Sequence, residues 1–352
     1  MFAMIRQLGI PTLFLSFSAN DLHWSELIVT LGNLVDNTDY TDDVLRDSLS
    51  WETRSRLVQS DPVTCVRHFD HRISQFIQTV LKSPNSPLGV MEDYFYRVEF
   101  QQRGSPHIHM LVWIKNSPKY GTEDERNITD YIDSIASCSQ NVTQECKEYL
   151  AMQMHKHSRS CRKGGKPECR FGIPFPPMRQ TLILQPFEGD NRSIYEDHYK
   201  NIQKQLSTVD EGVDFDAFLQ DVGLSESDYL KAIQTSIKTE KVFLKRAPNE
   251  NRINPYIKDI LNVWKGNHDV QFVLDAYACA MYIVSYIKKS SKGMSTLMAE
   301  ACKEARQGNK SLKQSVRHIG KRQPILFFSK ACRTKVEAVN LYQQLLLESE
   351  LF

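Results

Sequence analysis

The chain has 352 residues, of which 41% are hydrophobic and 24% are charged, the composition of an ordinary globular protein with room for two or three structural units. Its 44 basic and 42 acidic side chains give a net charge of only +2, so overall charge does not indicate a nucleic-acid binder. No run of 18 apolar residues predicts a membrane span, and the N-terminus lacks the pattern of a secretory signal. Eight cysteines in such a chain favour thiols or metal ligands over a disulfide framework.

The first half of the chain predicts a mixture of strands and helices. The expected elements are a strand at 13–18, a helix at 63–81, a hairpin of 95–100 with 108–114, and helices at 127–138 and 144–154. Asp61-Pro62 is a helix start signal directly before the helix predicted at 63–81. The two apolar runs of the hairpin flank a Gly-Ser-Pro turn.

His107 and His109 form the most informative pair, because alternation places both on one face of the second hairpin strand. If residue 101 pairs with 107, then 99 pairs with 109, and Glu99 and Gln101 share the face of the histidines. Two nitrogens and one or two oxygens with open positions suit Mg²⁺ or Mn²⁺. Glu99 and Gln101 both fit as the third ligand. Two half-exposed strand histidines without a metal are the plain alternative.

A second group of metal ligands lies in the irregular segment 155–178, which is rich in Cys, His, Gly and Pro. The candidate ligands are His155, His157, Cys161 and Cys169. Two imidazoles and two thiolates make a complete tetrahedral zinc shell, although the spacing departs from the usual zinc-finger pattern. Cys138 and Cys146 are spare candidates, and a loop with free thiols is the alternative. We expect a structural zinc ion to fold this polar segment.

The second half of the chain has an uneven charge distribution. Residues 188–228 carry eleven acidic and three basic side chains within an acidic, mostly helical insertion. Residues 288–322 carry ten basic and two acidic side chains and are placed to follow a phosphate backbone. The candidate DNA-binding side chains are Lys288, Lys292, Arg317, Lys321 and Arg322. Further expected elements are a strand at 181–184 and helices at 255–264, 275–289, 294–306, 312–318 and 335–347.

The helix predicted over 275–289 carries two tyrosines on one face. Tyr282 and Tyr286 are four residues apart, and Lys289 continues the same face. A tyrosine can be a covalent nucleophile, although its reference pKa of about 10 requires help from a cation or a base. Lys289 could give that help or contact a DNA phosphate. Packing of both rings into a core is the alternative interpretation.

Taken together, four segments resemble the Rep nuclease domain of Helitron transposases, which belong to the HUH endonucleases, and the Helitron helicase-like N-terminal domain. They are the opening strand region 9–28, the hairpin 99–109, the Cys/His segment 153–177 and the helix from Tyr282 to Lys289. The resemblance extends over about residues 7–345. It implies an α+β fold whose central antiparallel sheet is ferredoxin-like or RNA-recognition-like, with helical and Cys/His-rich insertions.

The same resemblance implies a metal-dependent single-stranded DNA endonuclease and strand transferase of rolling-circle transposition. His107 and His109 would be the HUH metal ligands, and Tyr282 and Tyr286 would be the nucleophiles that form a 5′-phosphotyrosine intermediate. The tyrosine helix would pack across the sheet beside the metal. Such a protein would act in the nucleus on transposon ends and target DNA.

The chain departs from the family in one respect, because Helitron proteins usually carry a helicase after the nuclease. No G-x-x-x-x-G-K-[ST] phosphate loop is present, so we expect no ATP hydrolysis by this chain and a helicase domain in a full-length protein. A catalytically inactive DNA-binding remnant and a zinc-dependent hydrolase are the competing interpretations. The expected organisation is a first nuclease part at 1–137, a Cys/His insertion at 138–178, an acidic helical insertion at 179–250, and the tyrosine helix with a basic helical part at 251–352.

Overall fold

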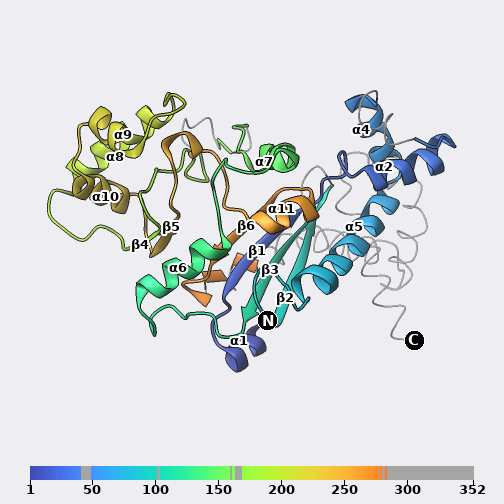
Figure 1. Ribbon diagram of the computed structural model, residues 1–352, viewed down its shortest axis with the longest axis horizontal. Helices are drawn as coiled ribbons and strands as arrows, with labels where there is room; N and C mark the ends of the chain where they lie inside the picture. The colour runs from blue at the N-terminus through green and yellow to red at the C-terminus, as the bar shows by residue number, and fades with distance from the viewer. Residues whose placement is uncertain are drawn as a thin grey trace, which may run out of the picture.

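A four-stranded antiparallel sheet with the order β2-β3-β1-β6 lies at the centre of the molecule (Figure 1). The strands are β1 (Leu13–Ser18), β2 (Met91–Phe100), β3 (Pro106–Ile114) and β6 (His268–Phe272). The computed structural model describes residues 1–40, 49–100, 104–158, 161–162, 169–276, 278–279 and 282–283. The predicted α+β fold with a central antiparallel sheet is confirmed, and β3 is an interior strand.

Helices account for much of the remaining described chain. They are α1 (Phe2–Leu8), α2 (Ser25–Leu31), α4 (Trp51–Ser60), α5 (Pro62–Phe76), α6 (Glu125–Ile135), α7 (Lys147–Gln153), α8 (Arg192–Leu206), α9 (Phe215–Val222), α10 (Glu226–Thr235) and α11 (Lys258–Trp264). Shorter π and 3-10 segments are η1 (Gly32–Asp36), η2 (Ile77–Leu81), η3 (Gln144–Cys146) and η5 (Pro248–Glu250). Side chains of Ser50, Asp61 and Asp124 accept hydrogen bonds from backbone N–H groups in the first turns of α4, α5 and α6, which explains where these helices begin.

One face of the sheet forms the main hydrophobic core. Alternate residues of β3, such as Ile108 and Met110, are fully buried there together with Phe17 of β1. The Phe17 ring contacts Phe76 of α5 and Trp264 of α11, with ring centroids 5.2 and 5.1 Å apart. Because apolar side chains fill this face, the polar residues that alternate with them along the strands lie on the opposite face of the sheet.

The opposite face of the sheet is covered only in part. A small cluster that includes Phe14, Leu111, Trp113 and Ile283 is buried there, with side chains of α1 packed against it. Toward the other ends of the same strands, this face carries serine, histidine and carboxylate side chains. The two halves of this face therefore have different chemistry.

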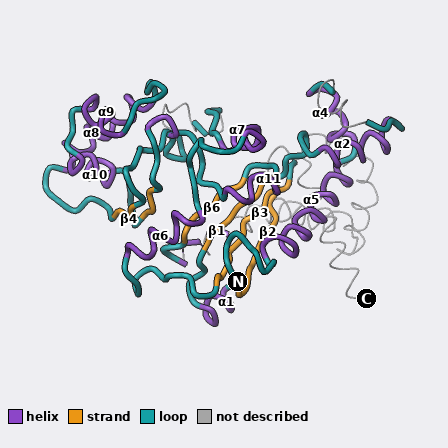
Figure 2. The backbone as a smooth tube through the Cα atoms, viewed as in Figure 1, coloured by secondary structure: helices purple, strands orange, loops and turns teal. Residues whose placement is uncertain are grey.

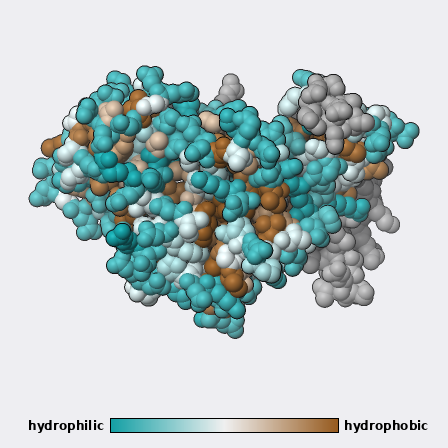
Figure 3. Space-filling model, viewed as in Figure 1, coloured by the Kyte–Doolittle hydropathy of each residue, from teal (hydrophilic) through white to brown (hydrophobic). Residues whose placement is uncertain are grey.

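The acidic insertion forms its own helical unit, on the left in Figure 1. The helices α8, α9 and α10 enclose a core that contains Phe218 and the fully buried Tyr229. A two-stranded sheet of β4 (Leu182–Leu184) and β5 (Lys241–Phe243) lies beside them. Figure 2 shows long loops between this unit and the central sheet. In Figure 3, hydrophilic surface covers much of the helical unit, and hydrophobic side chains gather near the middle of the same face.

The hairpin has a different register from the predicted one. Glu99 pairs with His107, and Arg97 pairs with His109. The prediction placed Glu99 opposite His109, so it was wrong by two residues. Pro106 already belongs to β3 and pairs with Phe100, at a strand end where the missing N–H of proline costs nothing. Because the side-chain period is two, Glu99 stays on the face of the histidines.

Two other expectations need correction. The strand β6 was not predicted, and α11 begins at Lys258, three residues after Pro255. The strand at 13–18 is confirmed at both ends, and the expected helices at 63–81, 127–138 and 144–154 are present with small shifts. No helix within the described residues has the length and apolar character needed to cross a membrane.

Candidate functional site

Two rows of polar side chains cross the sheet on the face opposite the main core. Strand pairing places Ser16 of β1 beside His109, with Asp269 of β6 on its other side. The second row places Ser18 beside His107. The antiparallel ladder therefore gathers side chains from β1, β3 and β6 at one end of the sheet, although these strands are far apart in the sequence.

His107 and His109 are both buried, and their ring centroids lie 4.6 Å apart. The hydroxyl of Ser18 is 2.8 Å from Nδ1 of His107. On the second histidine, Nε2 lies 3.1 Å from Oε2 of Glu99. The ring of Phe14 stacks on His109 with a centroid separation of 5.7 Å. These contacts fix the orientation of both imidazoles before any ligand binds.

The candidate nucleophile Tyr282 lies against this pair. Its ring centroid is 5.4 Å from that of His109 and 5.6 Å from that of Phe14, edge to face in both cases. Asp275 caps the local helix by accepting a hydrogen bond from the backbone N–H of Ala278. Ile283 is buried against the sheet, while Tyr282 is 46% exposed. The helix is thus held by its apolar side chains and presents the tyrosine at the histidine pair.

A groove of about 2150 Å³ runs past these residues. Its sheet side includes His107, His109 and Tyr282. The groove is also lined by His155 and Phe171 of the Cys/His segment, together with residues of β5. The histidine pair therefore lies in an open channel between the sheet and the insertions, large enough for an extended polymer.

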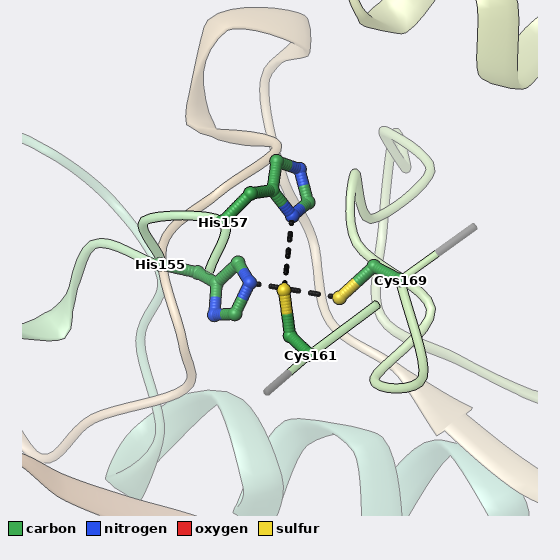
Figure 4. Close-up of side chains that lie close together, drawn as sticks. All are labelled: His155, His157, Cys161 and Cys169. Carbon is green, nitrogen blue, oxygen red and sulfur yellow. Dashed lines mark hydrogen bonds between the residues drawn. The ribbon is translucent and has the colours of Figure 1, made fainter. Parts of the chain in front are cut away.

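The Cys/His ligands meet in one cluster, in which all four ligand atoms lie within 4.8 Å of one another (Figure 4). Nδ1 of His157 is 3.6 Å from Sγ of Cys161, and Nε2 of His155 is 3.5 Å from Sγ of Cys169. Typical zinc bond lengths at a tetrahedral angle give a nitrogen–sulfur separation of about 3.6 Å. The residues could therefore hold a metal ion such as zinc, as their types predicted.

The protonation preferences of this cluster also suit metal binding. The backbone N–H of Ser158, 3.2 Å from the sulfur, lowers the pKa of the Cys161 thiol. Burial lowers the pKa of His155 and of His157, and nearby cations lower both further. A depressed thiol pKa favours the thiolate, and a depressed imidazole pKa favours the neutral ring. Both are the forms that bind metal ions.

Sequence reasoning missed Ser18 and Asp269. Ser18 belongs to a correctly predicted strand, but its contact with His107 depends on the register between distant segments. Asp269 lies on the unpredicted β6, and burial raises the pKa of its carboxyl to about 6. Alternation of polar and apolar residues along β6 was the available signal, over five residues only.

Several predicted site residues lie outside the described part of the chain. They are Gln101, Tyr286, Lys288, Lys289, Lys292, Arg317, Lys321 and Arg322. The choice between Glu99 and Gln101, the second tyrosine and the basic run therefore stay predictions.

Comparison with known proteins relates the N-terminal part of the chain to a described family. The family model described as the Helitron helicase-like domain at the N-terminus matches residues 1–112. No curated protein matches the chain. The resemblance to Helitron proteins is therefore confirmed for residues 1–112, a part that includes β1, β2 and both histidines of β3.

Proposed function

We propose that this protein is a metal-dependent endonuclease and strand transferase for single-stranded DNA, of the rolling-circle type used by Helitron transposons. The observation that carries the proposal is the contact of Tyr282 with His109. The Helitron match ends at residue 112, so the tyrosine comes from a part of the chain that the match does not include. Two independent segments thus supply the nucleophile and the metal ligands of one reaction.

His107, His109 and Glu99 are the residues that would hold the divalent ion, and Gln101 is the alternative to Glu99. Two imidazoles and a carboxylate suit Mn²⁺ or Mg²⁺ in a site that also binds phosphate. If Nδ1 of His107 donates to Ser18, the ring has its lone pair on Nε2, the tautomer that a metal ligand needs. When bound, the ion would neutralise charge that develops on the scissile phosphate.

In the first step, the hydroxyl oxygen of Tyr282 attacks phosphorus and the bond from phosphorus to the 3′ oxygen breaks. The tyrosine proton is lost to solvent or a base, and the departing oxygen takes a proton to become a 3′-hydroxyl. One phosphodiester bond is exchanged for another, so the reverse reaction can rejoin strands. Tyr286 would hold a second DNA end, and Lys289 would help to ionise a tyrosine or contact phosphate.

We also infer that His155, His157, Cys161 and Cys169 bind a structural zinc ion. Four protein ligands fill a tetrahedral shell and leave no position for water, which separates this site from the histidine pair. A helicase domain in a full-length protein and a nuclear location complete the proposed role in transposition.

A covalent capture experiment tests the proposal. The full chain is incubated with labelled single-stranded DNA and Mn²⁺, and adducts that survive denaturation are digested and located by mass spectrometry. We expect the nucleotide on Tyr282 or Tyr286, and no adduct in the variant that carries both Tyr282→Phe and Tyr286→Phe. Phenylalanine at position 282 keeps the ring contacts with His109 and Phe14, and each substitution removes only a hydroxyl, so this variant should fold normally.

Tyr195→Phe is the matched control, because this tyrosine lies on α8 away from the groove. Cleavage without any tyrosine adduct would favour the zinc-dependent hydrolase. DNA binding without cleavage or adduct would favour the inactive remnant.

A further inference from the structure

Phe171 is an exposed aromatic ring that lines the same groove as the histidine pair. It is 50% exposed, although an aromatic ring in a folded protein is normally buried for most of its surface. The guanidinium carbon of Arg170 lies 4.5 Å from its ring centroid. Both residues line the same groove as His107, His109 and Tyr282. An apolar ring and a cation are thus presented together in the groove that contains the proposed cleavage site.

The ring is held in place by the Cys/His cluster. The imidazole of His155 contacts Phe171 edge to face, with centroids 5.7 Å apart. The backbone N–H of Arg170 donates to the carbonyl of Cys161 over 2.9 Å, and Gly172 donates to Cys169 over the same distance. Gly172 has a φ of +71°, which closes a tight turn directly after the ring. These contacts tie Arg170 and Phe171 to residues that supply the metal ligands.

We propose that Arg170 and Phe171 form a stacking platform for an unpaired nucleobase of the DNA strand in the groove. This inference rests on the proposed function, because the ligand is the single-stranded substrate. Single-stranded DNA binders combine aromatic rings that stack on bases with cations that follow the phosphates. Phe171 supplies the first and Arg170 the second. The Cys/His cluster fixes the platform, so the platform acts on substrate position and not on the chemistry itself.

Binding of a fluorescent single-stranded oligonucleotide, measured by anisotropy in the His107→Ala background, tests the platform without cleavage. Phe171→Ala should raise Kd roughly 5- to 150-fold, the range expected for loss of one base–aromatic stack. Phe171→Tyr keeps a ring and should bind as the unsubstituted chain does. Trp51→Ala is the matched control, because Trp51 is 63% exposed and lies outside the groove lining. The zinc content of each variant shows whether the segment remains folded.

A scan with single abasic sites distinguishes stacking from a general structural effect. One abasic position should weaken binding to the chain that retains Phe171, and the same position should have no effect on the Phe171→Ala variant. Equal affinity of the two chains for the intact oligonucleotide, or an unchanged abasic profile, would overturn the platform and leave the nuclease proposal standing. If the chain that retains Phe171 fails to bind single-stranded DNA, or prefers duplex DNA, both the platform and the nuclease proposal would be overturned.

Discussion

Ser18 allows the positioning of the histidine pair to be tested separately from metal ligation. Its hydroxyl contacts Nδ1 of His107, so Ser18→Ala removes the group that fixes the ring and its tautomer. Loss of such an outer contact commonly costs 10- to 100-fold in metal affinity or activity, and we expect a change of about that size. The measurement is the Mn²⁺ concentration that gives half-maximal cleavage.

Ser18→Thr keeps the hydroxyl on a strand-compatible side chain and should restore most of the metal affinity. Ser16→Ala, on the same face of β1 beside His109, is the matched comparison. An unchanged Mn²⁺ requirement in Ser18→Ala would show that this hydroxyl does not position the ligand.

The neighbouring residues His268 and Asp269 should have opposite effects on the pH dependence of stability. Burial lowers the pKa of His268 to about 4, and its Nε2 accepts the backbone N–H of Ile257. The unfolded histidine binds its proton first, so this residue reduces stability as pH falls from about 6.5 to 4. Burial raises the pKa of Asp269 to about 6, so its folded form binds the proton first and offsets part of that loss.

Asp269→Asn should therefore make the loss of stability on acidification steeper. The full pKa shift of the Asp269 carboxyl corresponds to about 3 kcal/mol in the free energy of unfolding. Because this carboxyl is partly exposed to the groove, we expect a difference of about 1–2 kcal/mol between pH 6 and pH 4. Urea unfolding of the unsubstituted protein and of the Asp269→Asn variant at a series of pH values gives this difference in stability, because the other groups titrate alike in the two proteins. Parallel curves would show that the Asp269 carboxyl titrates normally in the folded protein.

At the scale of elements, the Cys/His segment should depend on its metal. Cys169→Ser should remove bound zinc and lower the urea midpoint, because a polar segment with few buried apolar side chains has little else to hold it. Elemental analysis and zinc release with a chromogenic chelator measure the loss. Cys146→Ser is the control, since Cys146 was a spare candidate and lies outside the cluster. Full zinc content in Cys169→Ser would remove this residue from the shell.

The sequence could predict those elements whose signals are local. β1 alternates between apolar residues and serine over its last four positions, α5 begins at Asp61-Pro62, and the Cys/His ligands are close in the sequence. β6 has only five residues and pairs with a strand at the other end of the described chain, so its signal was weak. The hairpin register was wrong because the length of the turn, not the alternation of the strands, determines which residues face each other.

At the scale of the whole molecule, the basic side chains of residues 288–322 should contribute to the salt dependence of DNA binding. Each phosphate contact on a single strand contributes a slope of about −0.7 in log affinity against log salt. The variant with Lys321→Gln and Arg322→Gln should therefore bind with a slope about 1.4 less negative. Lys200→Gln with Lys204→Gln on α8 gives a matched charge change in the acidic insertion. An identical slope in both double variants would exclude Lys321 and Arg322 from the phosphate contacts.

The sheet order has a consequence for the synthesis of the protein. β1 is made among the first residues, yet one of its two edges receives its partner only when residues 268–272 have left the ribosome. Until then the nascent chain displays an open strand edge beside the apolar side chains of Leu15 and Phe17, a surface that readily pairs with other chains. A product that stops after residue 112 would keep this edge permanently, and cells would have to degrade it or hold it on a chaperone.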